Sequence, residues 1–241
     1  MWGTLHAEWG KAWSVRAPLG CLVGTIVVVL VTAASLANDT VVSIGSGELP
    51  GGTTVPAIDS VASALQFGQL AFAAFALQLI TAEYSTGVIR STLLAQPRRH
   101  VVLGAKALVA ATVGLVTGAS VGAAAGASSA AILGQHLAEG RTIAQMSVSS
   151  GCMLAVVGVL VVGLGAALRS AVGTLALSSV VLVGSLALPD DVGRWAPGQA
   201  GAALLEGGGR FYGAAAGFAI LAAWAAAGLG LGLWLLERRD A

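Results

Sequence analysis

The segment Glu83-Tyr-Ser-Thr-Gly-Val-Ile-Arg-Ser-Thr-Leu-Leu-Ala-Gln-Pro-Arg-Arg-His-Val-Val-Leu-Gly-Ala-Lys106 separates two long apolar runs of a 241-residue chain. We name it the basic segment, because it holds four of the twelve Lys and Arg residues. Two interpretations fit it. It is either a basic loop that only fixes the topology of a membrane protein, or a structured surface that a cytoplasmic partner binds.

The composition around the basic segment indicates a polytopic membrane protein. Hydrophobic residues make up 56% of the chain and charged residues 10%, with a mean hydropathy of +0.87. A typical soluble domain has roughly 25% charged residues. So few charges could not cover the water-facing surface of a soluble fold of this length.

Stretches without charged residues predict the membrane spans. A helix needs ~20 apolar residues to cross the hydrocarbon core, and these stretches lack the alternation of barrel strands. We therefore expect one all-α membrane domain over residues 1–241, with six transmembrane helices. Their expected ranges are 17–38, 60–82, 107–133, 148–168, 170–189 and 213–236.

The distribution of Lys and Arg orients these spans. With the N-terminus inside, nine basic residues fall in inner segments and three in outer segments. Both termini are therefore expected in the cytoplasm. The sequence Ser35-Leu36-Ala37 before Asn38 also resembles a signal-peptide cleavage site, but the apolar run is longer than a usual signal sequence, which favours an uncleaved first span.

Residues 1–16 predict an amphipathic helix in the inner membrane interface. Trp2, Trp9 and Trp13 fall on one stripe of a helical wheel and Lys11 lies opposite, as in helices that place Trp rings at the headgroups. The alternative is a disordered tail that contains these residues. At the other side, 200–205 is too short to span, and is either a helix that dips into the outer interface or a plain loop.

Several functional classes lack their residues in this sequence. No P-loop, no His-Glu-x-x-His pair and no Gly-x-Ser-x-Gly turn occur, so we expect no enzyme, no bound cofactor and no metal site. Cys21 and Cys152 both lie in predicted spans, which argues against a disulfide. No charged residue lies inside a predicted span, so a secondary transporter would lack its usual ionisable group.

A short helix is expected within the basic segment. Ser85 or Thr86 could cap its N-terminus, and Gln96-Pro97 should end it, because the residue before a proline disfavours helical geometry. Lys106 lies about two turns beyond this break and could extend back to the anionic membrane surface.

The same residues resemble a known family. The pattern Glu83-Tyr-x-x-Gly87-x-Ile89-Arg90-x-Thr92-Leu93-x-x-x-Pro97-x-Arg99, followed by Lys106, is similar to the signature of ABC-2 type permease subunits of bacterial ABC transporters. Glu8-Trp9-x-Lys11-x-x-Ser14 resembles the N-terminal motif of many such subunits. The resemblance covers the whole chain, although only the basic segment is fairly specific.

This resemblance implies a permease of the exporter type in the bacterial inner membrane. Such subunits form homodimers or heterodimers and pair with a separate ATP-binding subunit, which would bind the ATP. The basic segment would hold the coupling helix, and residues 1–16 the connecting helix. The residues that match the coupling motif are Glu83, Gly87, Arg90, Thr92, Pro97, Arg99 and Lys106.

Two further expectations concern the partners. The spans are rich in small and apolar residues, which favours a hydrophobic or amphipathic cargo. We expect the chain to contact the lipid bilayer and to bind no nucleic acid. The alternative function is a membrane scaffold or sensor subunit whose basic segment binds a cytoplasmic partner other than an ATPase.

Overall fold

The computed structural model describes residues 2–14, 16–96 and 98–238. Within these ranges the chain is helical and forms no strand, only two isolated bridges, which confirms the all-α prediction. The long helices are α2 (Arg16–Gly45), α3 (Ala57–Thr86), α5 (Arg99–Leu133), α6 (Ile143–Leu168) and α10 (Ala214–Arg238). The shorter ones are α1 (Trp2–Ser14), α4 (Val88–Ala95), η1 (Gly134–His136), α7 (Ala171–Leu182), η2 (Gly184–Ala187), α8 (Asp190–Gly193) and α9 (Pro197–Glu206).

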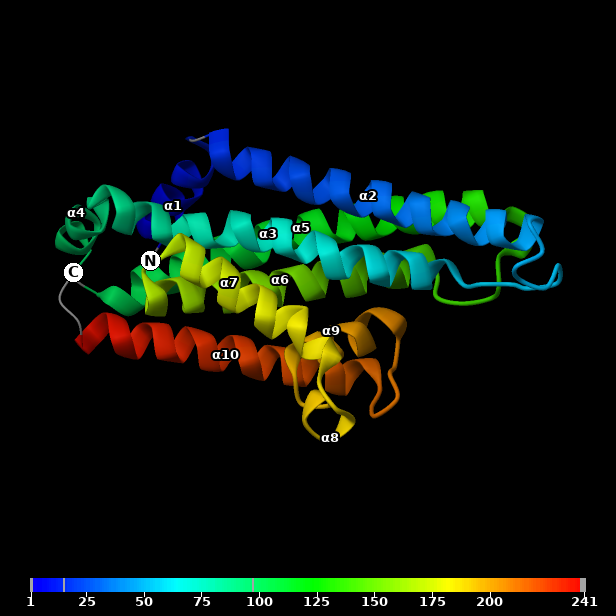
Figure 1. Ribbon diagram of the computed structural model, residues 1–241. Coiled ribbons are helices and arrows are strands. Elements are labelled where there is room, and N and C mark those ends of the chain that lie inside the picture. The colour runs from blue at the N-terminus through cyan, green and yellow to red at the C-terminus, as the bar shows by residue number, and fades with distance from the viewer. Residues whose placement is uncertain (1, 15, 97, 239–241) are drawn as a thin grey trace.

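Among the described residues, the five long helices are long and apolar enough to cross a membrane. They run side by side as a bundle (Figure 1). Helices α1 and α4 lie at one end of it, together with the end of α10, and we name this the α4 end. The loops 46–56 and 134–142 lie at the opposite end, which we name the loop end.

The predicted span 170–189 is not a single helix. Helix α7 has 12 residues, which rise about 18 Å and cannot cross a hydrocarbon core of ~30 Å. The short turn η2 follows, and Leu188 then takes an extended conformation with ψ of 147°. Since Leu188 precedes Pro189, this geometry is the one that proline imposes on its neighbour. The stretch 170–189 contains no charged residue, but the helix that it forms is interrupted by this backbone break.

Helix α9 lies inside the bundle, where the sequence left a dipping helix and a plain loop open. Seven of its ten residues are buried, and it packs against α10, α3 and α6. Its N-terminus meets the end of α7, where the N–H of Gly198 donates to the Ser185 hydroxyl at 3.1 Å. The segment is therefore a helix that begins beside the end of α7 and runs toward the loop end.

Glycines bring neighbouring helices into backbone contact. A Cβ atom built on Gly118 of α5 would lie 2.4 Å from the carbonyl oxygen of Ser150 in α6. One built on Gly232 of α10 would lie 2.6 Å from the carbonyl oxygen of Gly163. Small residues at such positions let membrane helices approach closely, so α6 is held between α5 and α10.

The loop between the first two long helices is shorter than the sequence predicted. Helix α2 continues to Gly45, beyond the expected span 17–38. It continues because it packs along α3 there, with Ile44 buried. The remaining loop is joined to the next one by a bridge, in which the N–H of Val55 donates to the carbonyl oxygen of His136 at 2.9 Å.

Candidate functional site

The turn between α3 and α4 depends on a glycine of the coupling motif. Gly87 has a φ of 73°, a left-handed conformation that glycine adopts without steric cost. Ser85 and Thr86 do not cap α4, because both hydroxyls donate back to the carbonyl oxygen of Ala82, at 3.0 and 2.8 Å. The capping prediction was wrong, because serine and threonine at a helix end can bond the preceding turn instead.

Helix α4 lies at the end of the bundle with an apolar exposed side. Ile89 anchors it in the core and is 4% exposed, whereas Val88 is 45% and Leu94 83% exposed. Gln96 follows in an extended conformation, so the helix ends before the proline position. The side chain of Arg90 and the whole of Pro97, both predicted coupling residues, lie outside the described part of the chain.

Four charged side chains meet beside α4, and we name them the charge cluster: Glu8, Lys11, Glu83 and Lys106. Its centre is Lys106, which is 1% exposed. The Lys106 ammonium donates to Oε2 of Glu8 at 2.5 Å and to Oε1 of Glu83 at 2.8 Å. Its third hydrogen bond, of 2.7 Å, goes to the carbonyl oxygen of Leu79. All three donors of this buried ammonium are thus satisfied.

Lys11 closes the charge cluster from the solvent side. Its ammonium lies 2.7 Å from Oε1 of Glu8 and 2.8 Å from Oε1 of Glu83, and its side chain is 42% exposed. Burial lowers the pKa of Lys11, but the hydrogen bonds to the two carboxylates outweigh it and raise the pKa above the ordinary value. Two ammonium groups and two carboxylates make the cluster electrically neutral, which buried charges require.

The charge cluster fastens four helices to one another. Glu8 and Lys11 come from α1, Glu83 from α3 and Lys106 from α5. Helix α4 joins through Thr92, whose hydroxyl oxygen lies 3.5 Å from the Lys11 ammonium. A second link runs from the Gln96 amide to the Thr4 hydroxyl at 3.3 Å. Helix α4 is therefore hydrogen-bonded to α1, which the ion pairs join to α3 and α5.

The structure gives Lys106 partners that the sequence did not predict. Two carboxylates and a carbonyl oxygen bind its ammonium within the bundle. Helices α3 and α5 are also longer than the expected spans and contain Glu83 and Lys106. The expected spans 60–82 and 107–133 contain no charged residue because they stop short of Glu83 and Lys106. Glu83 lies three residues before the end of α3, so the charges gather at the α4 end.

Glu8 is the functional residue that sequence reasoning missed. It stands in the N-terminal motif but received no role, and it is 4% exposed and bound to both lysines. Its spacing of three from Lys11 was the available signal, since such pairs face each other on a helix. In contrast to the buried Glu8 of the same helix, Trp2, Trp9 and Trp13 are exposed, at 79%, 41% and 39%.

Arg99 lies apart from the charge cluster. Its guanidinium donates to the carbonyl oxygen of Leu236 in the last turn of α10. A cation at a helix C-terminus stabilises the orphan carbonyl groups there. Arg99 therefore joins the start of α5 to the end of α10.

No group of His, Cys, Asp and Glu that could hold a metal ion occurs in the ranges that the structure describes. Cys21 and Cys152 are both free thiols. Within the described residues, the contacts of the charge cluster are ion pairs and hydrogen bonds.

Comparison with known proteins assigns no relative. No protein-family model matches the chain, and no curated protein matches it.

Proposed function

We propose that this chain is the membrane-spanning permease subunit of an ABC-2 type, ATP-driven transporter of the bacterial inner membrane. The α4 end faces the cytoplasm, where a separate ATP-binding subunit docks on α4. The observation that carries the proposal is a short helix with exposed apolar side chains that lies beside the charge cluster and contacts its Lys11 through Thr92.

The exposed side of α4 supports the docking step. Val88, Ser91 and Leu94 follow at intervals of three and are all exposed, so they share one side of the helix. Single exposed leucines are ordinary. Leu94, however, belongs to a helix outside the candidate spans. A groove on a partner protein would cover this exposed side of α4, as in helix-in-groove complexes.

The charge cluster supports the transmission step. ATP-driven closure of two partner subunits would push α4, and the ion pairs would carry this movement to α1, α3 and α5. A packed bundle with two arrangements can convert such a push into an inward-open and an outward-open state. Because the charges gather at the α4 end, they are poorly placed to carry an ion across the middle of the membrane.

The six-span topology of the proposed family requires a sixth membrane crossing in addition to the five long helices. We assign it to α7 and α9 together: α7 starts at the α4 end, and α9 begins beside Ser185, after the end of α7, and continues toward the loop end. The proposed assembly contains two permease chains, identical or different, and two ATP-binding subunits. Its cargo is a hydrophobic or amphipathic compound, and the ATP is bound by the partner.

Co-purification tests the proposal. The chain is expressed with the ATP-binding protein encoded beside it, as wild type, as Leu94→Glu and as the control Leu49→Glu, which changes a partly exposed leucine of the loop end. We expect wild type and Leu49→Glu to retain the ATPase and Leu94→Glu to lose it.

Equal retention by all three chains would show that α4 is not the docking helix. Failure of any ATPase to associate with wild type would reject the transporter proposal and favour the scaffold or sensor alternative.

A further inference from the structure

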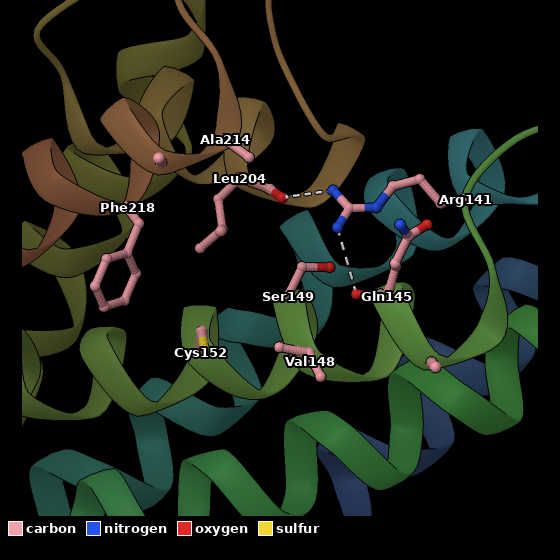
Figure 2. A pocket seen from close by; sticks show the side chains of 10 residues that line it. Arg141, Gln145, Val148, Ser149, Cys152, Leu204, Ala214 and Phe218 are labelled. Atoms are coloured by element: carbon pink, nitrogen blue, oxygen red, sulfur yellow. Dashed lines mark hydrogen bonds between the residues drawn. The ribbon is translucent and has the colours of Figure 1, made fainter.

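We propose that the cavity between α6, α9 and α10 at the loop end binds an acidic phospholipid of the surrounding membrane leaflet. The cavity has a volume of about 480 Å³ and is open on one side. Arg141 and Gln145 lie at one end of it, and Cys152 and Phe218 at the other (Figure 2). This inference does not rest on the proposed function, since it concerns a bound lipid rather than a cargo.

The charged end of the cavity fits a phosphate group. Arg141 donates to the carbonyl oxygens of Leu204 and Leu205, each at 3.0 Å, and these bonds hold it at the end of α9. Its second terminal nitrogen is directed toward Gln145, at 3.5 Å from the carbonyl oxygen (Figure 2). Among the described residues no carboxylate forms an ion pair with Arg141.

The charge of Arg141 is thus partly buried, and within the described residues it is balanced by carbonyl oxygens at the end of α9 rather than by a carboxylate. Burial lowers the pKa of its guanidinium below the ordinary value, and its Nε atom is buried without a hydrogen-bond partner in the described part of the chain. A partly desolvated cation gains most from an anion that it can bind through several N–H groups, and phosphate is such an anion. The side-chain Oε1 of Gln145 accepts a hydrogen bond from the N–H of Thr142 at the N-terminus of α6. This leaves the side-chain NH₂ group of Gln145 as a further donor.

The apolar end of the cavity fits an acyl chain. Val148, Cys152, Leu204 and Phe218 line it. Cys152 lies nine residues after the start of α6, which is about 14 Å along the helix axis at 1.5 Å per residue. The cavity therefore runs from the level of the loops into the depth of the acyl chains, with the cation at the headgroup end. A soluble anion would leave this apolar part empty.

The experiment measures lipid retention by native mass spectrometry. The purified chain is incubated in mixed micelles with equal amounts of phosphatidylglycerol and phosphatidylcholine. We expect wild type to retain about tenfold more phosphatidylglycerol, because the choline cation of phosphatidylcholine offsets the negative charge of its phosphate and weakens the charge-assisted contact with Arg141. Arg141→Gln should lose this preference, and Arg141→Lys should keep part of it. The control Arg210→Gln changes an exposed arginine of the same end and should behave as wild type.

A second variant separates binding from folding. Cys152→Phe fills the apolar part of the cavity and leaves Arg141 with its bonds to α9, so it decides the question even where Arg141→Gln fails to fold. It should reduce the bound phosphatidylglycerol at least to the level of phosphatidylcholine. Equal retention of both lipids by wild type, or full retention of phosphatidylglycerol by Cys152→Phe, would overturn the proposal. Binding of free inorganic phosphate in place of lipid would overturn it as well.

Discussion

The ammonium of Lys106 donates a 2.5 Å hydrogen bond to Oε2 of Glu8, a residue 98 positions earlier in the chain. Both side chains are almost completely buried. This bond attaches the N-terminal helix α1 to the start of α5, beside the helix that we propose as the docking element. We expect the stability of this end of the bundle to depend on it.

Replacement of Lys106 by methionine should destabilise the protein strongly. It leaves the carboxylates of Glu8 and Glu83 buried with only Lys11 as partner, and breaking a buried pair costs about 3–5 kcal/mol. The control Lys11→Met also leaves one ammonium against the two carboxylates, but the Lys11 side chain is 42% exposed, so water can replace part of its contact and the loss should be smaller. Thermal unfolding in detergent measures both. Equal losses would show that Lys106 is not the centre of the cluster.

The substitution Glu8→Gln should loosen α1 without unfolding the bundle. It removes one carboxylate from both lysines, so α1 should open more often. Hydrogen exchange of the α1 amides should accelerate on the order of tenfold, while α6 remains unchanged. Glu48→Gln, in the exposed loop 46–56, is the matched control. Unaltered exchange in α1 would contradict the assigned contact.

The turn at Gly87 should tolerate asparagine better than valine. A residue with a side chain pays about 1–2 kcal/mol in the left-handed region, and asparagine is the one that visits it most readily. Gly104→Val serves as control, because a Cβ atom there meets nothing within 4 Å. We expect unfolding temperatures in the order wild type, Gly87→Asn, Gly87→Val. An unchanged unfolding temperature of Gly87→Val would show that the turn is not left-handed.

The contact of α5 with α6 should fail when Gly118 is enlarged. Its Cβ position lies 2.4 Å from a backbone oxygen, which cannot move aside as a flexible side chain could. Gly118→Val should therefore cost about 1–3 kcal/mol, as overpacking does. Gly104→Val in the same helix should cost less. Similar unfolding temperatures for the two variants would argue against this close approach.

The contribution of Lys11 should persist up to strongly alkaline pH. Its pKa in the folded protein is raised above the ordinary value of 10.5. A raised pKa adds stability that is complete below the unfolded-state pKa and is lost as the pH rises through the folded-state pKa. The difference in unfolding temperature between wild type and Lys11→Met should thus stay constant from about pH 7 to 9 and shrink above about pH 10.5. A difference that disappears by about pH 8 would mean that the ion pairs do not form.

Local patterns explain which parts could be predicted. The absence of charges over long apolar runs predicts helices, and the helical wheel of residues 1–16 separates Lys11 from the Trp stripe. The pair Gln96-Pro97 predicts where α4 ends. Each of these signals acts within a few residues, so no knowledge of the tertiary structure is needed. The same locality hid the interruption of the predicted span 170–189, because hydropathy does not report the backbone break before Pro189.

The sequence by itself determined that this is an all-helical chain with membrane-spanning character, divided at the segment from Glu83 to Lys106. Only the tertiary structure decided how that segment is held, since Glu83 receives Lys11 from 72 residues away and Lys106 receives Glu8 from 98 residues away. It also decided that Arg141 lies against the end of α9 beside an apolar cavity. Ion pairs and cavities depend on which helix ends meet in space, and spacing along one helix carries no information about that.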